Sequence, residues 1–542
     1  MLAPRSGITN RNLPPATVLE SIVRKFTPLL AALVSVCAVP ATAAASSGAW
    51  SFWSAPTLHP PRIHADSHAA GAKLAPGYFM LANTKDLAIK ERMAGQGGPL
   101  ILDSNLQPVW FDPVPLKLSG QGTSLLGANA TFNLRAQKYR GQPVLTWWEG
   151  TVGSTGATLA GQDMMVDQHY QPVGKPLVAQ GPTGCTGTGC WVVSQHEFLI
   201  QGHDAWVTAY RNIPMDLRKY GGPANGTLLD TAVQEYDLTS GQQLFNWDAL
   251  DHIPLSQSHS KPLTSGVWDA YHENSVNLSN GTFVVSMRNM WSAYDVSEAT
   301  GKIVWTLSGD PKLSSFKVPA SGQFQWQHDV ELHPGGLVTV FDDHCCNVVG
   351  AGKLAPPSGP ASHGLLLKLN LAKHTAALVA RYIRNNNSYT PFLGNTQLIS
   401  GGDVVVGWGN VPNFTEFTKS GKVLLDAVIP NPDMSYRTYL ENWVGLPAKP
   451  PNGAVRKSGG KIIVYASWNG ATRVVAWRVL AGASASHLTV AVSRAARTGF
   501  ETAIPVSGSH KFFKLQAFAS RGRLIGTSAA FSPAGPTLVG SY

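Results

Sequence analysis

The chain has 542 residues, of which 44% are hydrophobic and only 14% are charged, so it can bury a large core; 54 glycines and 37 prolines argue against a helical bundle and favour many short strands joined by turns. The net charge of +10 comes without a block of Lys or Arg or a basic-aromatic repeat, which argues against nucleic-acid binding. A mildly positive field favours anionic substrates instead.

The N-terminus has the order of a secretory signal. Arg24 and Lys25 precede an apolar stretch, residues 29–39, which small residues follow. Positive, apolar and small segments in this order are typical of a signal peptide, and the apolar stretch is short for a membrane span. We therefore expect a signal peptide at 1–45, a secreted or cell-envelope protein, and an N-terminal extension at 46–76. An uncleaved membrane anchor is the alternative.

A strand–turn–strand pattern then recurs six times. Each copy is a short strand, a polar turn that often ends in Gly, and a second strand. The copies begin at Leu102, Val166, Tyr236, Tyr294, Leu369 and Glu416. A β-rich repeat of roughly this length is typical of a β-propeller, because one blade cannot bury both faces of its own sheet. We predict an all-β fold with a six-bladed β-propeller at 77–447.

Four cysteines follow the expected signal. They are Cys185, Cys190, Cys345 and Cys346. An even number in an exported chain favours disulfides, and four cysteines allow three pairings. We favour Cys185–Cys190 across the Gly-rich loop TGCTGTGC, since a bridge between the two adjacent cysteines would be strained. The CxxC spacing of a cysteine-based zinc site is missing, so we do not expect such a site.

A second repeat lies between the copies of the first. Its strand–turn–strand segments begin at Gln195, Tyr271, Gln327 and Leu393. Alignment on the turn places three histidines at one repeat position, His196, His272 and His328, whereas the fourth copy has a glycine there, followed by Asn395. Equivalent positions in a propeller are related by rotation about the central axis. The three histidines should therefore converge near one mouth of the channel.

Other polar residues accompany these histidines. Arg211 follows His196 by 15 residues and Arg288 follows His272 by 16. In a regular strand Asn274 shares a face with His272, and the acidic residue after each histidine points the other way. Histidine, amide and guanidinium groups together suit a tetrahedral anion, as in phosphoryl or sulfuryl transfer. Three histidines could also hold zinc or copper, but an arginine beside a metal is unfavourable.

The chain changes character after the last repeat. Residues 448–460 have the Gly, Pro and Lys content of a linker. Short alternating strands follow at 461–542, which predicts a small immunoglobulin- or fibronectin-like β-sandwich.

Six segments in the predicted propeller resemble the arylsulfotransferase family of exported bacterial and fungal propellers. They are GQPVLTWWEG (141–150), HEF (196–198), DAYHENSV (269–276), SMRN (286–289), QHDVEL (327–332) and GNTQLISGGDVVVGWG (394–409). Each motif is short, but their order and spacing match from about residue 78 to 446. The C-terminal segment WNGATRVVAWRVLAG resembles a module at the end of many bacterial members.

The resemblance implies a sulfotransferase that uses small-molecule aryl sulfates and phenols and needs neither a nucleotide sulfate donor nor a cofactor or metal. It also implies a ping-pong cycle through a sulfated histidine. Matched by motif, His328 is the nucleophile, and His196, His272, Asn274 and Arg288 hold the sulfuryl oxygens. Candidate substrate-binding residues are Trp148, Trp326, Arg211 and Asn395; the two tryptophans could stack on an aryl ring or belong to the propeller core.

Two other functions stay open on the sequence. One is a non-catalytic binding propeller for an anionic aryl or sugar ligand, which would bind without turnover. The other is a metal-dependent hydrolase built on the three histidines, which would copurify with metal and lose activity with a chelator. In each case the partners are small molecules, with cell-envelope association as a further possibility.

Overall fold

The computed structural model describes residues 48–85, 91–114, 129–153, 158–180, 184–263, 265–344, 348–349, 353–354, 361–384, 388–458 and 460–533. The chain divides into two units, Met1–Ala44 and Ala45–Tyr542. The expected signal peptide and the pair Cys345 and Cys346 lie outside the described residues.

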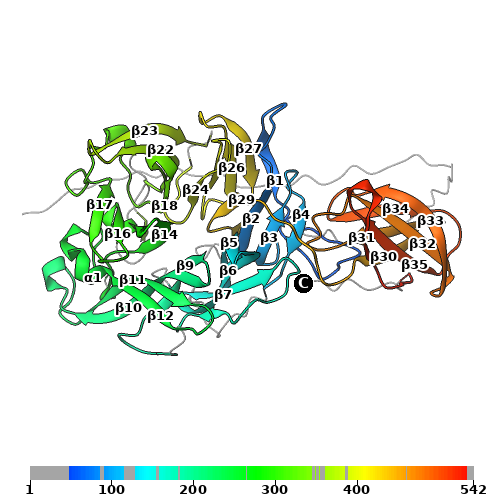
Figure 1. Ribbon diagram of the computed structural model, residues 1–542, viewed down its shortest axis with the longest axis horizontal. Coiled ribbons are helices and arrows are strands. Elements are labelled where there is room, and N and C mark those ends of the chain that lie inside the picture. Colours follow the sequence, from blue (N-terminus) through cyan, green and yellow to red (C-terminus); the bar gives the residue numbers. More distant parts are fainter. Residues whose placement is uncertain are drawn as a thin grey trace, which may run out of the picture. The chain divides into compact units, whose positions relative to one another are not determined.

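Six sheets of four or five strands make up the larger part of the described chain (Figure 1). In sequence order, the first sheet consists of β2 (Tyr78–Lys85), β3 (Gly98–Leu102) and β4 (Pro108–Phe111) with β28 (Asp433–Met434) and β29 (Thr438–Glu441), and the second of β5 (Asn129–Tyr139), β6 (Gln142–Val152), β7 (Thr158–Asp167) and β8 (Leu177–Val178). The third sheet consists of β9 (Val192–Gln201), β10 (Asp204–Met215), β11 (Gly226–Asp237) and β12 (Gln243–Asp248) with β13 (Val267–Asp269), and the fourth of β14 (Glu273–Ser279), β15 (Thr282–Met287), β16 (Ser292–Ser297) and β17 (Ile303–Ser308). The fifth sheet consists of β18 (His328–His333), β19 (Leu337–Asp342), β22 (His363–Asn370) and β23 (Thr375–Tyr382), and the sixth of β24 (Asn395–Leu398), β25 (Val404–Gly407), β26 (Asn413–Phe417) and β27 (Val423–Val428) with β1 (His64–His68).

The two sequence repeats map onto these sheets. Each copy of the first repeat contains the turn between the last two strands of one sheet; the copy at Tyr294, for example, joins β16 to β17. Gly301 has φ +66° in that turn, a conformation that glycine adopts without steric penalty. Each copy of the second repeat contains the first two strands of a sheet, β9–β10, β14–β15, β18–β19 and β24–β25.

One strand from each of the six sheets takes part in a closed ring of contacts. β5 contacts β9, β9 contacts β14, β14 contacts β18, β18 contacts β24, β24 contacts β29, and β29 contacts β5. β29 is the late strand that pairs with the early β2, so one sheet joins both ends of the propeller segment. The all-β propeller class is thus confirmed, while the blade count of six stays a prediction.

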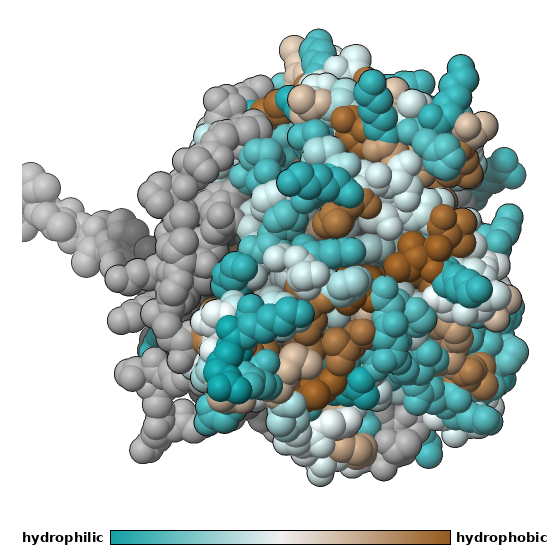
Figure 2. Space-filling view, turned by 90° about the vertical axis from the view of Figure 1, so that its left-hand side faces the viewer, coloured by the Kyte–Doolittle hydropathy of each residue, from teal (hydrophilic) through white to brown (hydrophobic). Residues whose placement is uncertain are grey.

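Large apolar side chains fill the space between neighbouring sheets. One cluster contains Trp206 and Trp247 of the β9–β12 sheet together with Phe283 and Tyr294 of the β14–β17 sheet, all of them buried. Burial contributes about 25 cal/mol for each Å² of apolar surface, so clusters of this kind hold the sheets in place. Hydrophobic groups on the face in Figure 2 are scattered among hydrophilic ones, which is normal for a protein surface.

The inner strands are interrupted by β-bulges near the predicted site. The pairing register shifts between Glu273 and Ser275 in β14 and between His328 and Glu331 in β18. His272 and Asp329 both have φ +52°, which is uncommon for residues with a Cβ. A bulge re-aims the side chains around it. The regular alternation that we expected for His272 and Asn274 therefore does not apply.

The C-terminal part has two antiparallel sheets. They consist of β30 (Asn452–Ser458), β31 (Lys461–Ser467) and β34 (Glu501–Val506), and of β33 (His487–Ala496), β32 (Ala476–Ser484), β35 (Phe512–Phe518) and β36 (Leu524–Thr527). The linker expected at 448–460 is wrong for residues 452–458, because these form β30 and pair with β31. The immunoglobulin-like class of this part stays a prediction. In the expected N-terminal extension at 46–76, residues 64–68 form strand β1, which pairs with β27.

The remaining elements are short. They are the β20 (Val348–Val349) and β21 (Lys353–Leu354) hairpin, α1 (Ala249–His252), and the single 3₁₀ turns η1 (Arg218–Tyr220), η2 (Leu255–Gln257), η3 (Arg288–Met290), η4 (Ala320–Gly322), η5 (Pro334–Gly336) and η6 (Ser520–Gly522). Within the described ranges no helix has the length and hydrophobicity needed to cross a membrane.

Candidate active site

The three aligned histidines meet inside the ring of inner strands. The ring centroid of His272 lies 5.3 Å from that of His196 and 6.1 Å from that of His328. Tyr436, which follows β28, packs its ring edge-on against His196 and His328, with centroids 5.8 and 6.2 Å away. His196 and His328 are buried. The convergence expected from the repeat is therefore present in the structure.

Carboxylates hold two of the imidazoles. His328 Nδ1 lies 2.6 Å from Asp343 Oδ2, and neither side chain is exposed to solvent. His272 Nδ1 lies 2.6 Å from Asp269 Oδ2, where both side chains are 13% exposed. The backbone N–H of Leu393 donates to His328 Nε2 over 3.2 Å. Because Nε2 accepts, the neutral ring of His328 carries its proton on Nδ1, facing the carboxylate.

His196 has neutral partners instead. Its Nδ1 lies 3.0 Å from Ser194 Oγ and 3.3 Å from Tyr210 Oη. The Tyr210 hydroxyl donates to the backbone oxygen of Glu273, so it can accept a hydrogen bond from the imidazole. Gln195 Nε2 lies 3.4 Å from His196 Nε2. This environment holds a neutral imidazole and offers no charge to stabilise an imidazolium.

Burial keeps two of the histidines neutral. It lowers the pKa of His328 well below its usual range, and the positive charge of Arg288 lowers it further. It likewise lowers the pKa of His196, where His272 and Arg437 act in the same direction. Both rings therefore keep a lone pair at neutral pH.

Arg288, at the start of η3, brings the guanidinium to this cluster. Its Nη1 donates to Asn289 Oδ1 over 3.0 Å, and its Nη2 donates to the Pro391 carbonyl over 2.7 Å. The guanidinium carbon lies over the Trp326 ring, 5.0 Å from the ring centroid. Its Nε is buried and has no hydrogen-bond partner among the described residues. A buried donor without a partner is a candidate contact for an anion.

A second charged layer borders the histidines. The fully buried Arg437 lies 3.0 Å from Glu197 and 3.4 Å from Asp329, and its Nη2 donates to the backbone oxygen of Asn274 over 2.7 Å. Burial raises the pKa of Asp329 to about 7, although Arg437 opposes this. Glu197 also pairs with Arg135, 3.1 Å away. These acids were expected to point away from the site; in the bulged strands they hold Arg437 against it.

Asn274 and Trp326 lie at the site, each with a structural contact. The Asn274 Nδ2 donates to the Gln327 carbonyl over 2.8 Å, in the residue that precedes His328. Its Oδ1 is buried and has no partner among the described residues. Trp326 is 6% exposed, and its ring contacts that of Trp291 edge-on at 5.3 Å. Asn274 thus bonds the residue next to the predicted nucleophile, and Trp326 lies under Arg288.

Three predicted substrate-binding residues have partners elsewhere. Arg211 pairs with Asp230 and Asp248 and lies over Trp191, so the arrangement of Arg288 is not repeated. Asn395 uses both amide atoms on the backbone of Thr438. Trp148 is 2% exposed and stacks on Phe132, which in turn contacts Tyr436. Along this series of ring contacts, Trp148 is therefore two rings further from the histidines than Tyr436.

Sequence reasoning missed four residues of this site: Asp269, Asp343, Tyr436 and Arg437. Asp269 had a signal, because an acid three residues before His272 lies within one turn of it. A signal for Asp343 also exists, in the β18–β19 hairpin. His328 pairs with Phe341 there, so Asp343 follows two residues beyond the partner of His328. Tyr436 and Arg437 follow the last repeat, and only closure of the ring brings them here. His344, the residue after Asp343, bonds Asp342 and not the histidine cluster.

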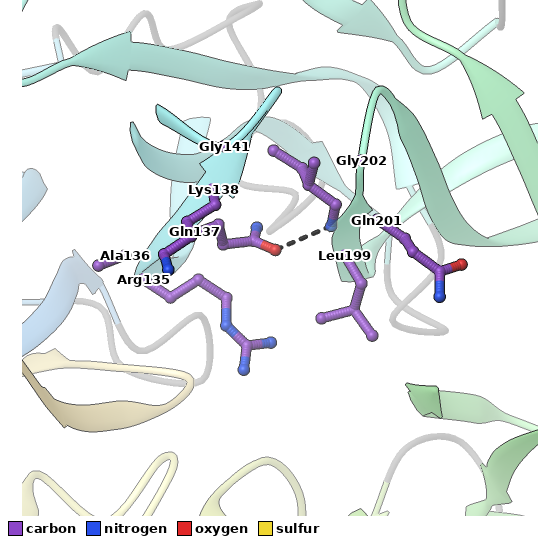
Figure 3. Close-up of a pocket in the computed structure, with 9 residues that line it drawn as sticks. Arg135, Ala136, Gln137, Lys138, Gly141, Leu199, Gln201 and Gly202 are labelled. Atoms are coloured by element: carbon purple, nitrogen blue, oxygen red, sulfur yellow. Dashed lines mark hydrogen bonds between the residues drawn. The ribbon is translucent and has the colours of Figure 1, made fainter. Parts of the chain in front are cut away.

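Other sites lie apart from the histidines. Cys185 and Cys190 form the expected disulfide. Among the described residues, one group of three has ligand atoms close enough for a metal: His203, Asp204 and Asp237, with His203 exposed. A cavity of about 540 Å³ is lined by the ends of β5 and β9, including Arg135 and Lys138, with Gln137 accepting from the Ile200 N–H (Figure 3). None of the three histidines lines it.

Fold and site together define a propeller-like protein whose channel holds a buried cluster of imidazole and guanidinium groups. The family model of the arylsulfotransferases (ASST) matches residues 135–429, more than half of the chain and all of the predicted catalytic residues. The chain belongs to the arylsulfotransferase family. Membership supports aryl sulfotransferase activity in general, with small-molecule aryl sulfates and phenols as substrates.

Solved structures give more distant similarities. A protein of unknown function from Bacteroides caccae is 11% identical, with 67% of this chain and 98% of that chain covered and a TM-score of 0.36. The β-propeller domain of Cps50 (Swd1) from Myceliophteria thermophila is 10% identical, with 61% and 88% covered and a TM-score of 0.22. These scores are too low to carry an argument about the site. Among curated proteins, none matches the chain.

Proposed function

We propose that this protein moves a sulfuryl group from a phenolic sulfate ester to a phenolic acceptor in a ping-pong cycle, through a sulfohistidine at His328. One observation carries the proposal: a fully buried, neutral imidazole with Nε2 as acceptor lies beside Arg288, whose Nε has no partner among the described residues. Family membership makes sulfuryl the tetrahedral group that fits this combination.

In the first half-reaction, His328 Nε2 attacks sulfur and forms the N–S bond. The bond between sulfur and the phenolic oxygen breaks, and its electron pair stays on that oxygen. The 3.2 Å hydrogen bond from the Leu393 N–H to Nε2 is long, so an approaching sulfur can replace it. The freed N–H then faces the sulfuryl group. In the second half-reaction, the acceptor oxygen attacks the same sulfur and the N–S bond breaks.

Charge in the transition state spreads over the sulfuryl oxygens and the phenolic oxygen. Arg288 offers its free Nε–H, and its position is fixed by Asn289, Pro391 and Trp326. Donors that are already in place stabilise developing charge without reorganisation, and each is typically worth about 10²–10³ in rate. We assign Arg288 this role, with His196 and Asn274 as further contacts to the sulfuryl group.

His272 is the best candidate for proton transfer. A phenol in water has a pKa of about 10, so a phenolate is a better leaving group once it is protonated. His272 has Asp269 on Nδ1, and that carboxylate stabilises an imidazolium while leaving Nε2 to give the proton. The same nitrogen takes the proton of the acceptor phenol in the second half-reaction. His196 lacks a carboxylate partner of this kind.

The proposal includes export of the protein to the cell envelope or medium. The order of basic, apolar and small residues at the N-terminus supports it, and so does the Cys185–Cys190 disulfide, since such bonds persist in oxidising compartments. The substrates are small aryl sulfates and phenols, and no nucleotide donor or cofactor takes part.

The test is turnover of 4-nitrophenyl sulfate, with and without added phenol, by the wild type, His328→Ala and His344→Ala. We expect nitrophenolate release that rises with phenol and falls by at least about 10³ in His328→Ala. His344→Ala is the matched control, because its ring pairs with Asp342 outside the cluster, and it should behave as the wild type.

Each alternative has its own outcome. Release that is equally fast without phenol would indicate a sulfatase. Activity that disappears with a chelator, together with stoichiometric bound metal, would indicate the metal-dependent hydrolase. Binding of aryl sulfates without release would leave a binding propeller, and any of the three results would overturn the proposal.

A further inference from the structure

The carboxylate of Asp343 lies directly beside the predicted nucleophile, although the proposed substrate is itself an anion. It is fully buried, directly follows the end of β19, and lies 2.6 Å from His328 Nδ1. Its backbone oxygen accepts from Ser362 Oγ over 2.5 Å, and Ser362 Oγ accepts from the Thr390 N–H over 2.7 Å. The turn that carries this carboxylate is thus fixed to two other segments.

This position is electrostatically unfavourable for a site that binds sulfate esters. A second negative charge next to the substrate repels the sulfuryl oxygens, and burial of a carboxylate is itself unfavourable. Burial raises the pKa of Asp343 well above its usual range, and Asp342 adds to this while Arg288 opposes it. The Oδ1 atom has no partner among the described residues, so the carboxylate is not explained by a wider hydrogen-bond network.

We propose that Asp343 is a positioning residue that holds His328 in the tautomer with the proton on Nδ1, so that Nε2 presents its lone pair to sulfur. The inference rests on the proposed function. Neutral imidazole exists in two tautomers, and only one leaves Nε2 free of hydrogen. When the N–S bond forms and the phenolic O–S bond breaks, the ring gains positive charge; the Nδ1 proton stays in the hydrogen bond to Asp343, whose carboxylate stabilises that charge.

The first test is Asp343→Asn, which keeps the shape of the side chain. An asparagine can turn its NH₂ toward Nδ1 and so favour the tautomer with the proton on Nε2, which cannot attack. We expect kcat for 4-nitrophenyl sulfate to fall by about 10³ or more, with KM within about threefold, because the substrate itself does not touch Asp343. A merely structural role would lower the folded fraction and leave the kcat of the folded enzyme unchanged.

Asp342→Asn is the matched control. It removes the neighbouring buried carboxylate, whose partners are His344 Nδ1, His363 Nε2 at 3.5 Å and the Gln325 N–H, and not His328. We expect its kcat to stay within about threefold of the wild type. If Asp343→Asn is folded and keeps a near-wild-type kcat, or if both variants lose activity equally, the inference is wrong.

A second measurement does not depend on any variant of Asp343. Long-range ¹H–¹⁵N spectra of the ¹⁵N-histidine-labelled full chain report the tautomer of each ring, and the signals of His328 are those missing in His328→Gln. We expect a protonated Nδ1 and an unprotonated Nε2. A proton on Nε2, or an imidazolium at neutral pH, would overturn the inference even if the enzyme is active. A wild type without turnover would instead refute the proposed function, and the spectrum would still report the tautomer.

Discussion

Arg288 and Arg211 occupy corresponding places in two copies of one repeat, yet their surroundings differ. Arg288 adjoins the histidines and is held by the Pro391 carbonyl and the Trp326 ring. Arg211 is 25% exposed and its guanidinium is taken up by Asp230 and Asp248. Local sequence sets the difference, because Asp230 on β11 and Asp248 on β12 lie across the sheet from Arg211.

This contrast allows a test at a single residue. We expect Arg288→Lys to lower kcat/KM for 4-nitrophenyl sulfate by about 10²–10³, because the three N–H groups of an ammonium diverge from one nitrogen and cannot reproduce the planar fork that reaches Asn289, Pro391 and the substrate together. Arg211→Lys is the matched control and should change kcat/KM by less than about threefold. Steady-state rates of both variants check this. Similar losses in the two variants would contradict the role of Arg288.

The pKa of His328 gives a prediction about pH. Because that pKa is lowered, the ring stays neutral, and hence nucleophilic, at pH values below the ordinary histidine value of 6.5. We expect the rate of His328 sulfation, measured as the nitrophenolate burst in single turnovers between pH 7.5 and 5.5, to show no decline from protonation of His328 on passing below pH 6.5. A rate that falls tenfold per pH unit starting at 6.5, without unfolding, would contradict a neutral buried nucleophile.

Among the elements, the bulged beginnings of the inner strands shape the site. They rotate the backbone so that His272 and His328 meet, and they turn Glu273 inward. Glu273 is fully buried; Thr231 donates to its Oε2, and its Oε1 has no partner among the described residues. Such bulges are common next to active sites, where they orient side chains that a flat strand would not.

The buried carboxyl of Glu273 predicts how stability changes with pH. Burial raises its pKa from 4.5 to about 8, so the folded protein keeps a proton that the unfolded chain releases above about pH 4.5. The unfolded state then binds fewer protons, and the free energy of unfolding falls as the pH rises from about 4.5 to 8. Glu273→Gln has no such proton. Its stability relative to the wild type should therefore increase between pH 5 and 8, by on the order of a few kcal/mol.

Urea unfolding of both proteins at pH 5, 6, 7 and 8 measures this difference. A difference that stays constant over the range would show that Glu273 does not hold its proton in the folded state. A difference that shrinks as the pH rises would show that the sign of its pKa change is wrong.

Strand pairs were predictable from sequence, whereas the bulges were not. Glycine turns and alternating residues mark strand pairs such as β16–β17 directly, because those signals are local. A bulge at His272 or Asp329 has no such signal: both residues have positive φ without being glycine, and the packing of neighbouring sheets maintains that conformation. For the same reason the three histidines were found by their repeat position, while the contacts of Glu197 and Asp329 with Arg437 were not.

At the scale of the whole molecule, every second sheet around the ring carries an asparagine whose side chain bonds the backbone of the next sheet. Asn133 Nδ2 donates to the carbonyls of Gln195 and His196, and Asn274 Nδ2 donates to that of Gln327. Asn395 donates to the Thr438 carbonyl and accepts from the Thr438 N–H. These contacts lie between residues far apart in the sequence, which is why no local pattern indicated them. They also link the backbone beside His196 and His328 to the preceding sheet.

Asn395 is the contact at which the ring closes, because Thr438 begins β29, the strand that returns to β2. In Asn395→Ala the buried N–H and C=O of Thr438 lose their side-chain partner, and each unsatisfied buried group costs about 1–3 kcal/mol. We expect the free energy of unfolding to fall by roughly 2–4 kcal/mol. Gln397→Ala is the matched control: it makes the same pair of bonds to Leu440 but is partly exposed, so water can replace it and the loss should be smaller.

Chemical denaturation of both variants, together with their kinetics, separates closure from substrate binding. A large loss of stability with KM close to that of the wild type would assign Asn395 to closure of the ring. A rise in KM of tenfold or more with unchanged stability would restore the substrate-binding role predicted from its repeat position. The distinction matters for the site, because Tyr436 and Arg437 reach the histidines on the same segment that leads into β29. Loosening of that segment should therefore lower activity at temperatures below those at which the sheets unfold.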